Sequence, residues 1–260
     1  MMNFITKNKN RSYPKTAGKI FAVLFWIAVW QILYMIIQQE ILIVSPARVL
    51  QRLYELSGSA EFWLSALYSM RHVLQGFVLG VIAGTFLAVL TSASKAMDDL
   101  FYPLVSIIKA TPVVSFIILA LVWIRSDRVP GFTAFLSVTP VVMSNVANGI
   151  HKTDRGLLQM AKCYRFGAWR TVRRVYVPSV MPYFTAACTT GMGFAWKTAI
   201  AAEVLSNTGI SIGGKIYDAK VYLETADLFA WTAVVIVLSV ILERLMMLLM
   251  RRIGQKYNVS

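Results

Sequence analysis

Long apolar runs, separated by short polar connections, recur along most of the chain. Runs of this length match the roughly 20 residues that an α-helix needs to cross the hydrocarbon core of a membrane. No segment between them is long enough for a soluble domain of useful size. The pattern predicts an all-α membrane protein with six transmembrane helices, at residues 20–37, 67–92, 100–124, 130–149, 183–204 and 228–250.

Basic residues set the predicted orientation of these spans. The stretch before the first span carries five lysines and arginines and no acid, and the 150–182 connection is also strongly basic. By the positive-inside rule such segments are cytoplasmic, so an even number of spans places both chain ends in the cytoplasm. We therefore divide the chain into a basic tail (1–19), a membrane domain (20–252) and a second cytoplasmic tail (253–260).

The composition supports this division. Hydrophobic residues make up 57% of the chain, and the formal net charge is +14. Anionic lipid headgroups and membrane topology account for the excess of basic residues, so no nucleic-acid partner is predicted. Cys163 and Cys188 fall in different environments, and His72 and His151 fall on opposite sides of the membrane. The sequence therefore predicts no disulfide, no metal site and no pair of a nucleophile and a base.

The connection from 150 to 182 has a helical pattern of its own. Asp154 is a suitable N-cap, and an apolar face follows it at helical spacing. Gly167 interrupts this pattern, and a second amphipathic stripe follows before Pro178. A connection of this length and pattern favours a short helix, a turn and a second helix that meet a partner. The first apolar face consists of Leu157, Leu158, Ala161 and Tyr164; the second stripe consists of Trp169, Val172 and Val175, opposite Arg170, Arg173 and Arg174.

Glycine and lysine at membrane depth mark other features of the spans. Gly76, Gly80 and Gly84 share one helix face and permit a close approach of a neighbouring helix, either as a static contact or as a sliding one. Pro112 is expected to kink the third span. Lys109 and Lys197 are costly at this depth, so each must either line a polar path for an anion or be neutralised by a neighbouring helix.

One glycine-rich segment resembles a nucleotide-binding motif. Residues 209–215 read GISIGGK, like the first part of a phosphate-binding loop, but Ile216 follows where magnesium coordination needs Ser or Thr. No β-strand precedes it, and the predicted topology places it outside the cell. We interpret the segment as a flexible turn and expect no ATPase activity in this chain.

The 150–182 connection resembles the signature loop of permease subunits of bacterial ATP-binding cassette (ABC) importers. Gln159, Met160 and Ala161 stand for that family's Glu-Ala-Ala, Arg165 for its glycine, and residues 175–178 for its Ile-x-Leu-Pro end. We expect Gly167 to take over the turn made at the family's glycine. The resemblance extends from about residue 45 to 250. It is similar to the nitrate, sulfonate and taurine branch at Ser45-Pro46-Ala47, at the glycine-rich span, at Lys109–Pro112 and at Trp196-Lys197…Ala202-Glu203.

The resemblance implies a multi-pass subunit of the bacterial cytoplasmic membrane with type I importer architecture and a cytoplasmic coupling helix. It implies a second permease copy, two ATPase subunits that bind ATP and magnesium, and an extracytoplasmic substrate-binding protein. The chain itself would hold no cofactor. The expected ATPase-docking residues are Asp154, Leu157, Leu158, Gln159, Ala161, Lys162, Tyr164, Arg165, Gly167, Trp169 and Arg170. The expected translocation-path residues are Lys109, Thr111, Pro112, Met192, Trp196, Lys197 and Glu203.

The substrate implied by that branch is a sulfonate, taurine or nitrate-type anion, although relatives in it also carry thiamine precursors and other small heterocycles. Two other classes remain open on the residues alone. An ion-coupled secondary transporter needs intramembrane carboxylates, and Glu203 and Glu243 are the candidates. A membrane-embedded hydrolase needs a nucleophile and a base at membrane depth.

Overall fold

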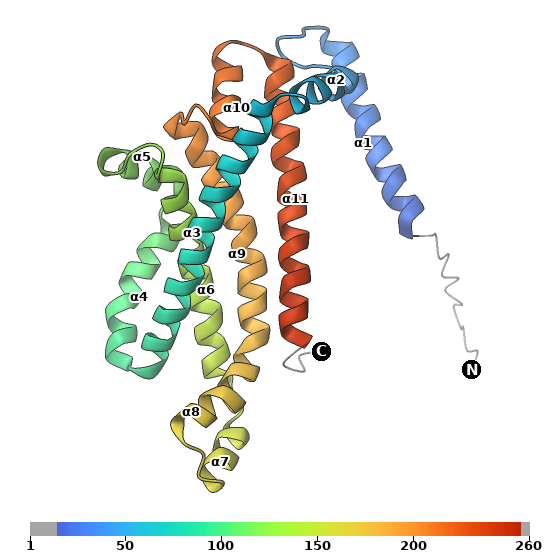
Figure 1. The fold of residues 1–260 in the computed structure, drawn as a ribbon. Helices are drawn as coiled ribbons and strands as arrows, with labels where there is room; N and C mark the ends of the chain where they lie inside the picture. Colours follow the sequence, from blue (N-terminus) through green and yellow to red (C-terminus); the bar gives the residue numbers. More distant parts are fainter. Residues whose placement is uncertain (1–14, 256–260) are drawn as a thin grey trace, which may run out of the picture.

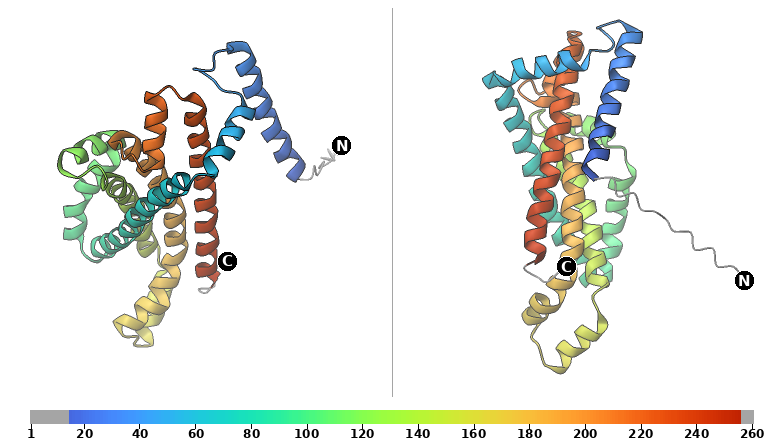
Figure 2. Two further views of the ribbon diagram at one scale, coloured as in Figure 1. Left: turned by 45° about the horizontal axis from the view of Figure 1, so that its top comes forward. Right: turned by 90° about the vertical axis from the view of Figure 1, so that its right-hand side faces the viewer.

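The computed structural model describes residues 15–255, and every regular element in that part of the chain is helical. Helices α3, α6, α9 and α11 run side by side as the main bundle, and α4 packs on its outer side (Figures 1 and 2). The elements are α1 (Lys15–Ile37), α2 (Pro46–Ser57), α3 (Ala60–Ala93), α4 (Lys95–Ala110), α5 (Val113–Trp123), α6 (Val129–His151), α7 (Arg155–Cys163), α8 (Ala168–Thr171), the π-helix η1 (Val172–Tyr176), α9 (Val177–Ser206), α10 (Ile212–Val221) and α11 (Thr225–Gln255).

The predicted glycine face of α3 forms the closest helix contact of the bundle. A Cβ atom on Gly76 would overlap the carbonyl oxygen of Gly131 in α6. One on Gly80 would lie 2.8 Å from Val138 Cβ, and one on Gly84 would lie 2.6 Å from the Thr139 carbonyl oxygen. These distances are shorter than any normal contact, so the backbones of α3 and α6 meet only because these positions lack side chains. The prediction of close approach on this face is confirmed.

The predicted third span, 100–124, is two helices. α4 ends at Ala110, α5 begins at Val113, and their axes differ by 105°. Thr111 and Pro112 both have extended-type ψ angles, 131° and 135°. Because Pro112 lacks an amide hydrogen and disfavours helical geometry in the residue before it, the helix stops and restarts there. The expected kink is therefore a complete break.

The six predicted spans do not all correspond to helices that are long and apolar enough to cross a membrane. Helices α1, α3, α6 and α11 are long and apolar enough to cross a membrane, and the bent pair α4–α5 adds a fifth candidate. α9 covers the predicted fifth span with 30 residues, but its threonines, glycines and two charged residues make it less apolar. The count of six crossings and the cytoplasmic chain ends stay predictions. The described end of α11 lies at the same end of the bundle as α7 and α8, and α2 and α10 lie at the other (Figure 1).

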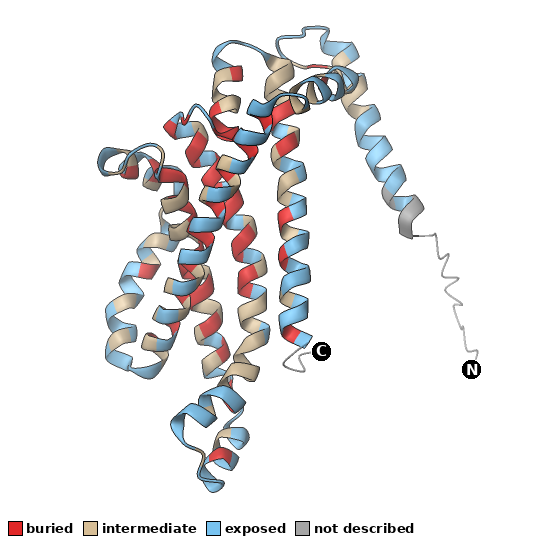
Figure 3. Ribbon diagram, in the orientation of Figure 1, coloured by how far each residue is buried: buried red, intermediate tan, exposed pale blue. Residues whose placement is uncertain are grey.

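The outward faces of the bundle are largely apolar and exposed (Figure 3). α1 diverges from the bundle along most of its length and buries none of its membrane-length window, but it contacts α2 and its Trp30 stacks on Phe229 of α11. In α11 the buried share of that window is 17%, whereas in α6 it is 56%. A protein surface of this kind requires a lipid or protein environment. The distribution places α6 at the centre of the protomer.

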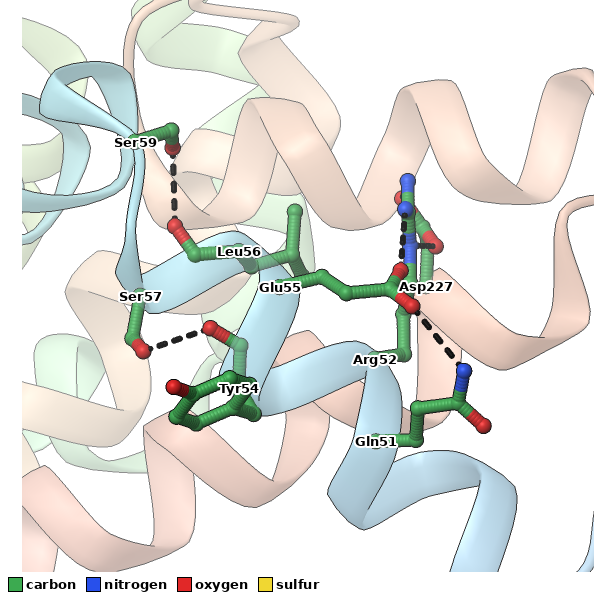
Figure 4. Close-up of polar contacts among 8 residues, drawn as sticks. All are labelled: Gln51, Arg52, Tyr54, Glu55, Leu56, Ser57, Ser59 and Asp227. Atoms are coloured by element: carbon green, nitrogen blue, oxygen red, sulfur yellow. Dashed lines mark hydrogen bonds and ion pairs between the residues drawn. The ribbon is translucent and has the colours of Figure 1, made fainter.

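Sequence analysis did not anticipate α2, which lies across the end of the bundle opposite α7 and α8 (Figure 1). Ser45 caps its first turn by accepting a hydrogen bond from the Arg48 amide at 3.3 Å, and Pro46 occupies the first helical position. Arg52 fixes α2 to α11 through two bonds to Asp227, from Nε at 2.5 Å and from Nη2 at 3.0 Å (Figure 4). Arg52 also bonds Glu55, which lowers the pKa of that carboxyl group.

Substituting Gly76→Ala tests the α3–α6 contact. The new methyl group would overlap the Gly131 carbonyl oxygen, so the two helices must separate. We expect a loss of about 1–3 kcal/mol in stability, seen as a lower melting temperature of the purified permease. Gly209→Ala is the matched control, because nothing lies within 4 Å of the added Cβ atom. Equal melting temperatures for both variants would show that α6 can move away at no cost.

Candidate functional site

The α7–α8 connection projects from one end of the bundle (Figures 1 and 2). Asp154 Oδ1 accepts a hydrogen bond from the Gly156 amide at 2.7 Å, so the predicted N-cap is confirmed. On α7, Leu157 and Met160 are 41% and 44% exposed, and Tyr164 follows at 72%. Ala161 is only 2% exposed and faces back into the protomer. The apolar face available to a partner is therefore Leu157, Met160 and Tyr164, and sequence analysis had not assigned Met160 to it.

The turn after α7 is made at Arg165, and the expectation of a glycine turn at Gly167 is wrong. Arg165 has φ 50°, whereas Gly167 has φ −67°. The Phe166 amide bonds the Ala161 carbonyl at 2.9 Å, and the Arg165 amide bonds the Lys162 carbonyl at 3.0 Å. These two bonds define a Schellman motif with Arg165 in the left-handed position that glycine prefers. Arg165 thus occupies the family's glycine position in sequence and also in backbone geometry.

The other predicted docking residues lie on the surface of the same connection. Gln159, Lys162, Trp169 and Arg170 are exposed, Leu158 is half-buried, and the Arg170 guanidinium lies 5.6 Å from the centre of the Phe166 ring. In the second predicted stripe, Trp169 is exposed whereas Val175 is buried. The connection therefore presents a mixed apolar and basic surface.

α8, η1 and α9 form one uninterrupted helical segment from Ala168 to Ser206. The junction residues Val172, Tyr176 and Val177 all keep right-handed helical dihedral angles. Pro178 supplies no amide hydrogen, and the wider turn of η1 accommodates its ring. The same helical segment therefore reaches from the projecting connection to the opposite end of the bundle.

The break between α4 and α5 forms one wall of a small cavity. The cavity has a volume of ≈ 200 Å³ and reaches Lys109, Thr111, Ser137 of α6, and Phe194 and Thr198 of α9. Lys109 Nζ donates a hydrogen bond to Ser144 Oγ at 2.5 Å. The structure thus brings together two of the predicted path residues, Lys109 and Thr111, beside exposed Pro112.

The remaining path candidates lie elsewhere. Met192 and Trp196 are each 1% exposed, and Trp196 Nε1 donates to the Val235 carbonyl of α11 at 3.2 Å, so both are core residues. Lys197 is exposed. Glu243 of α11 approaches α9 one turn away, where its Oε1 would lie 3.0 Å from a Cβ atom on Gly193.

Glu203 is fully buried where α9, α3 and α10 meet. Its Oε2 accepts hydrogen bonds from Ser69 Oγ of α3 at 2.7 Å and from the Gly213 amide at 3.0 Å. Ser69 Oγ in turn accepts from the Ile212 amide at 3.0 Å, and Ser211 Oγ accepts from the Gly214 amide at 2.9 Å. Three side chains from different parts of the chain therefore satisfy the free amide groups of the first turn of α10.

This contact corrects the interpretation of residues 209–215 as a flexible turn. Only the first part is a turn, and Ile212–Lys215 belongs to α10. A Cβ atom on Gly213 would overlap the side chain of Glu203, and one on Gly214 would overlap the Thr208 carbonyl. The glycine pair is required for the close approach of this helix end to a carboxylate of the same chain. Sequence analysis missed the pairing because Ser69 and Glu203 are 134 positions apart.

Comparison with known proteins assigns the fold and the signature connection to one family. Residues 76–256 match the family model described as "Binding-protein-dependent transport system inner membrane component". The chain belongs to this family, and it is the permease subunit of an ABC importer and a component of the inner membrane. This membership decides against an ion-coupled transporter and a membrane hydrolase.

Individual relatives agree with this assignment. A probable ABC transporter permease of Brucella melitensis is 27% identical over 81% of this chain and 85% of its own length. A putative aliphatic sulfonates transport permease of Bacillus subtilis is 24% identical over 87% of this chain and 83% of its own length. A nitrate import permease of Leptolyngbya laminosa is 25% identical over 83% of this chain and 78% of its own length. A crystal structure of an amino acid ABC transporter has the same fold, with a TM-score of 0.61 at 16% identity over 72% of this chain and 91% of that one.

Truncating Glu203 tests the contact with α10. Glu203→Ala leaves the Gly213 amide and the Ser69 hydroxyl without their shared acceptor, at a cost of about 1–3 kcal/mol for each buried group. We expect faster proteolysis after Lys215 and Lys220 and a lower melting temperature. Glu224→Ala is the control, because Glu224 is exposed in the same connection. Unchanged proteolysis of Glu203→Ala would mean that other contacts hold α10 in place.

Proposed function

We propose that this permease imports a small oxyanion of the sulfonate or nitrate type, driven by ATP hydrolysis in a separate subunit. The Lys109 cavity carries the substrate part of the proposal. Its volume of ≈ 200 Å³ suits a small solute, and Lys109 and Ser137 place an ammonium group and a hydroxyl on a lining that is otherwise mostly apolar. The hydroxyls of Thr111 and Thr198 also reach the cavity, but each donates to a carbonyl of the chain, of Ile107 and Phe194 respectively. The first turn of α5 begins beside it, and the free amide groups of a helix start favour negative charge.

The relatives support an anion, because two of them are named as permeases for aliphatic sulfonates and for nitrate. A neutral heterocycle such as a thiamine precursor gains less than an anion from a lysine at membrane depth. Lys109 has a competing structural role, since it lies in the last turn of α4 and a cation there is favourable to the helix dipole. If Lys109 contacts the solute, loss of its charge slows uptake; if it only stabilises the end of α4, loss of its charge leaves the uptake rate of the assembled transporter unchanged.

The coupling part of the proposal rests on the exposed side of α7. Leu157, Met160 and Tyr164 recur on one face of a short helix whose two ends are fixed by the Asp154 cap and the Arg165 turn. A stiff helix with an apolar face is suited to insertion into a groove of an ATPase subunit. Exposed Lys162 and Arg170 would add charged contacts at the edge of that groove.

The assembly we propose contains two copies of this permease, two ATPase subunits and an extracytoplasmic binding protein. The ATPases would bind at the α7–α8 end and supply ATP and magnesium chemistry. The binding protein would deliver substrate at the opposite end, near α2 and α10. The bundle would then alternate between inward-facing and outward-facing states.

Placing charge on the exposed face of α7 tests the coupling. Leu157→Asp or Met160→Asp would bury a carboxylate in the docking groove and should reduce the ATPase retained on the purified permease at least about tenfold, or about 1.4 kcal/mol. The control is Val221→Asp, 54% exposed at the other end of the bundle. ATPase retention at wild-type stoichiometry by both α7 variants would place the docking face elsewhere, and ATP-driven uptake by the chain alone would refute the need for a partner.

Removing the charge of Lys109 tests the substrate class. In proteoliposomes with the ATPase and binding protein, Lys109→Gln should slow uptake of nitrate or ethanesulfonate about tenfold, since a desolvated charge-assisted bond is worth about 1.5–3 kcal/mol. Lys109→Arg should retain most of the rate, and both variants should assemble normally. Lys197→Gln in the same assay tests the other membrane lysine. If only the Lys197 variant is slow, the anion passes along that face of α9, and if neither is slow, the anion path does not use these lysines.

A further inference from the structure

A second, larger cavity lies in the groove between α3 and the first half of α6, outside the site described above. Its volume is ≈ 870 Å³, and it is open to the membrane-facing surface of the protomer. One end is polar and is lined by Tyr68, Arg71, His72, Gln75, Asp127 and Arg128, and most of the remaining lining is apolar. Those apolar residues are mainly Leu79, Ile82, Phe86, Phe132 and Phe135. The groove is therefore charged at one end and apolar along the rest of its length.

The apolar part has the length of one membrane leaflet. Gln75 and Phe86 are separated by about 16 Å along the axis of α3, at 1.5 Å per residue. Half of a hydrocarbon core of about 30 Å is about 15 Å. The charged end lies toward the start of α3, at the end of the bundle opposite α7 and α8 (Figure 1). In the predicted span 67–92 the middle of the bilayer lies near Leu79, about 12 Å along α3 from Arg71, so an acyl chain that began at the headgroup level beside Arg71 would reach the middle between Leu79 and Ile82 and end near Phe86.

The charged end is suited to a phosphate group. Arg71 and Arg128 are both exposed, and neither takes part in an ion pair among the described residues. Asp127 also lines this end, but its Oδ1 already lies 3.4 Å from Arg125 Nε. Two guanidinium groups are therefore available, and guanidinium is the side-chain group that best matches the oxygens of a phosphate.

We propose that this groove binds one anionic phospholipid of the leaflet opposite the α7–α8 connection. Arg71 and Arg128 bind its phosphate, and one acyl chain lies on Leu79, Ile82 and Phe86. The exposed fractions of those three side chains, 58%, 61% and 62%, leave room for such a chain. A small transported anion would use only the charged end, and the apolar wall would offer it no hydrogen-bond donor.

Lipid rebinding to the delipidated full transporter tests this proposal. The probes are phosphatidylglycerol and phosphatidylcholine with equal acyl chains, counted by native mass spectrometry. The wild type should retain phosphatidylglycerol in preference to phosphatidylcholine. The double variant Arg71→Gln, Arg128→Gln should lower the retention of phosphatidylglycerol about tenfold or more. The two arginine-to-lysine variants should retain most of it. Lys220→Gln is the control, as an exposed lysine at the same end of the bundle that does not line the groove.

A second variant separates the acyl chain from the headgroup. Ala83→Trp fills the groove while Arg71 and Arg128 stay, and it should also reduce phosphatidylglycerol retention. Equal retention of both lipids by the wild type, or unchanged retention by the arginine variants, would overturn the proposal. So would displacement of the bound lipid by inorganic phosphate alone, which would indicate a site for a free anion.

A second copy of the chain is the other molecule that could cover the groove. Ile82→Cys, in a chain with Cys163→Ser and Cys188→Ser, should stay monomeric on non-reducing gels after oxidation if lipid covers the groove. A disulfide between two copies at that position would show that another permease covers it, and would overturn the lipid assignment. None of these outcomes depends on which solute the transporter imports.

Discussion

The contact between α3 and α6 at Gly76, Gly80 and Gly84 is the constraint on which the rest of the bundle depends. A membrane offers little hydrophobic driving force between helices, so association relies on close packing of backbones. Because the three glycines allow that packing, α6 becomes the central helix, and α9 packs against both α6 and α3. The groove with Arg71 and the cavity with Lys109 both lie beside α6, and their shapes follow from its position.

The second constraint is electrostatic and lies at the outer end of α9. A carboxylate without a counter-ion is expensive away from water, and Glu203 is fully buried. The amide groups of α10 and the hydroxyl of Ser69 provide hydrogen-bond donors instead of a basic side chain. In an isolated helix start those amides would attract a soluble anion. Here the chain's own carboxylate occupies that position, which explains how a segment so similar to a phosphate-binding loop has a structural role.

The sequence predicted features that depend on local chemistry. Apolar run length predicted the long helices α1, α3, α6 and α11, the Asp154 cap predicted the start of α7, and glycine spacing predicted the close face of α3. It did not predict which side of a helix packs inward, because nearly all residues of a membrane span are apolar. Trp196 therefore looked like a path residue. In the amphipathic connection, Ala161 shares the predicted apolar face with Leu157 and so looked as available to a partner. The hydrogen bonds of Glu203 could not be predicted from the sequence, because its partners come from distant segments of the chain.

The Arg165 turn shows a different limit. A left-handed backbone costs an ordinary residue about 1–2 kcal/mol, so sequence reasoning moves such a turn to the nearest glycine. The two Schellman hydrogen bonds hold the turn at Arg165 despite that cost. Likewise, a proline within a span predicts a kink, but only the tertiary structure decides that Thr111–Pro112 becomes a 105° break.

The continuous helical segment from Ala168 to Ser206 has a consequence for membrane leakage. It extends over about 58 Å at 1.5 Å per residue, from the projecting connection to the carboxylate at Glu203. The segment is not a straight rod, because η1, Pro178 and Pro182 lie where it enters the bundle and such features bend helices. Its backbone is nevertheless helical throughout, so a shift of the connection is passed on to α9. A displacement that opens one end also moves the other. If the bundle alternates between the two states proposed above, this linkage would disfavour a pore open to both sides at once and would limit the leak of small ions during transport.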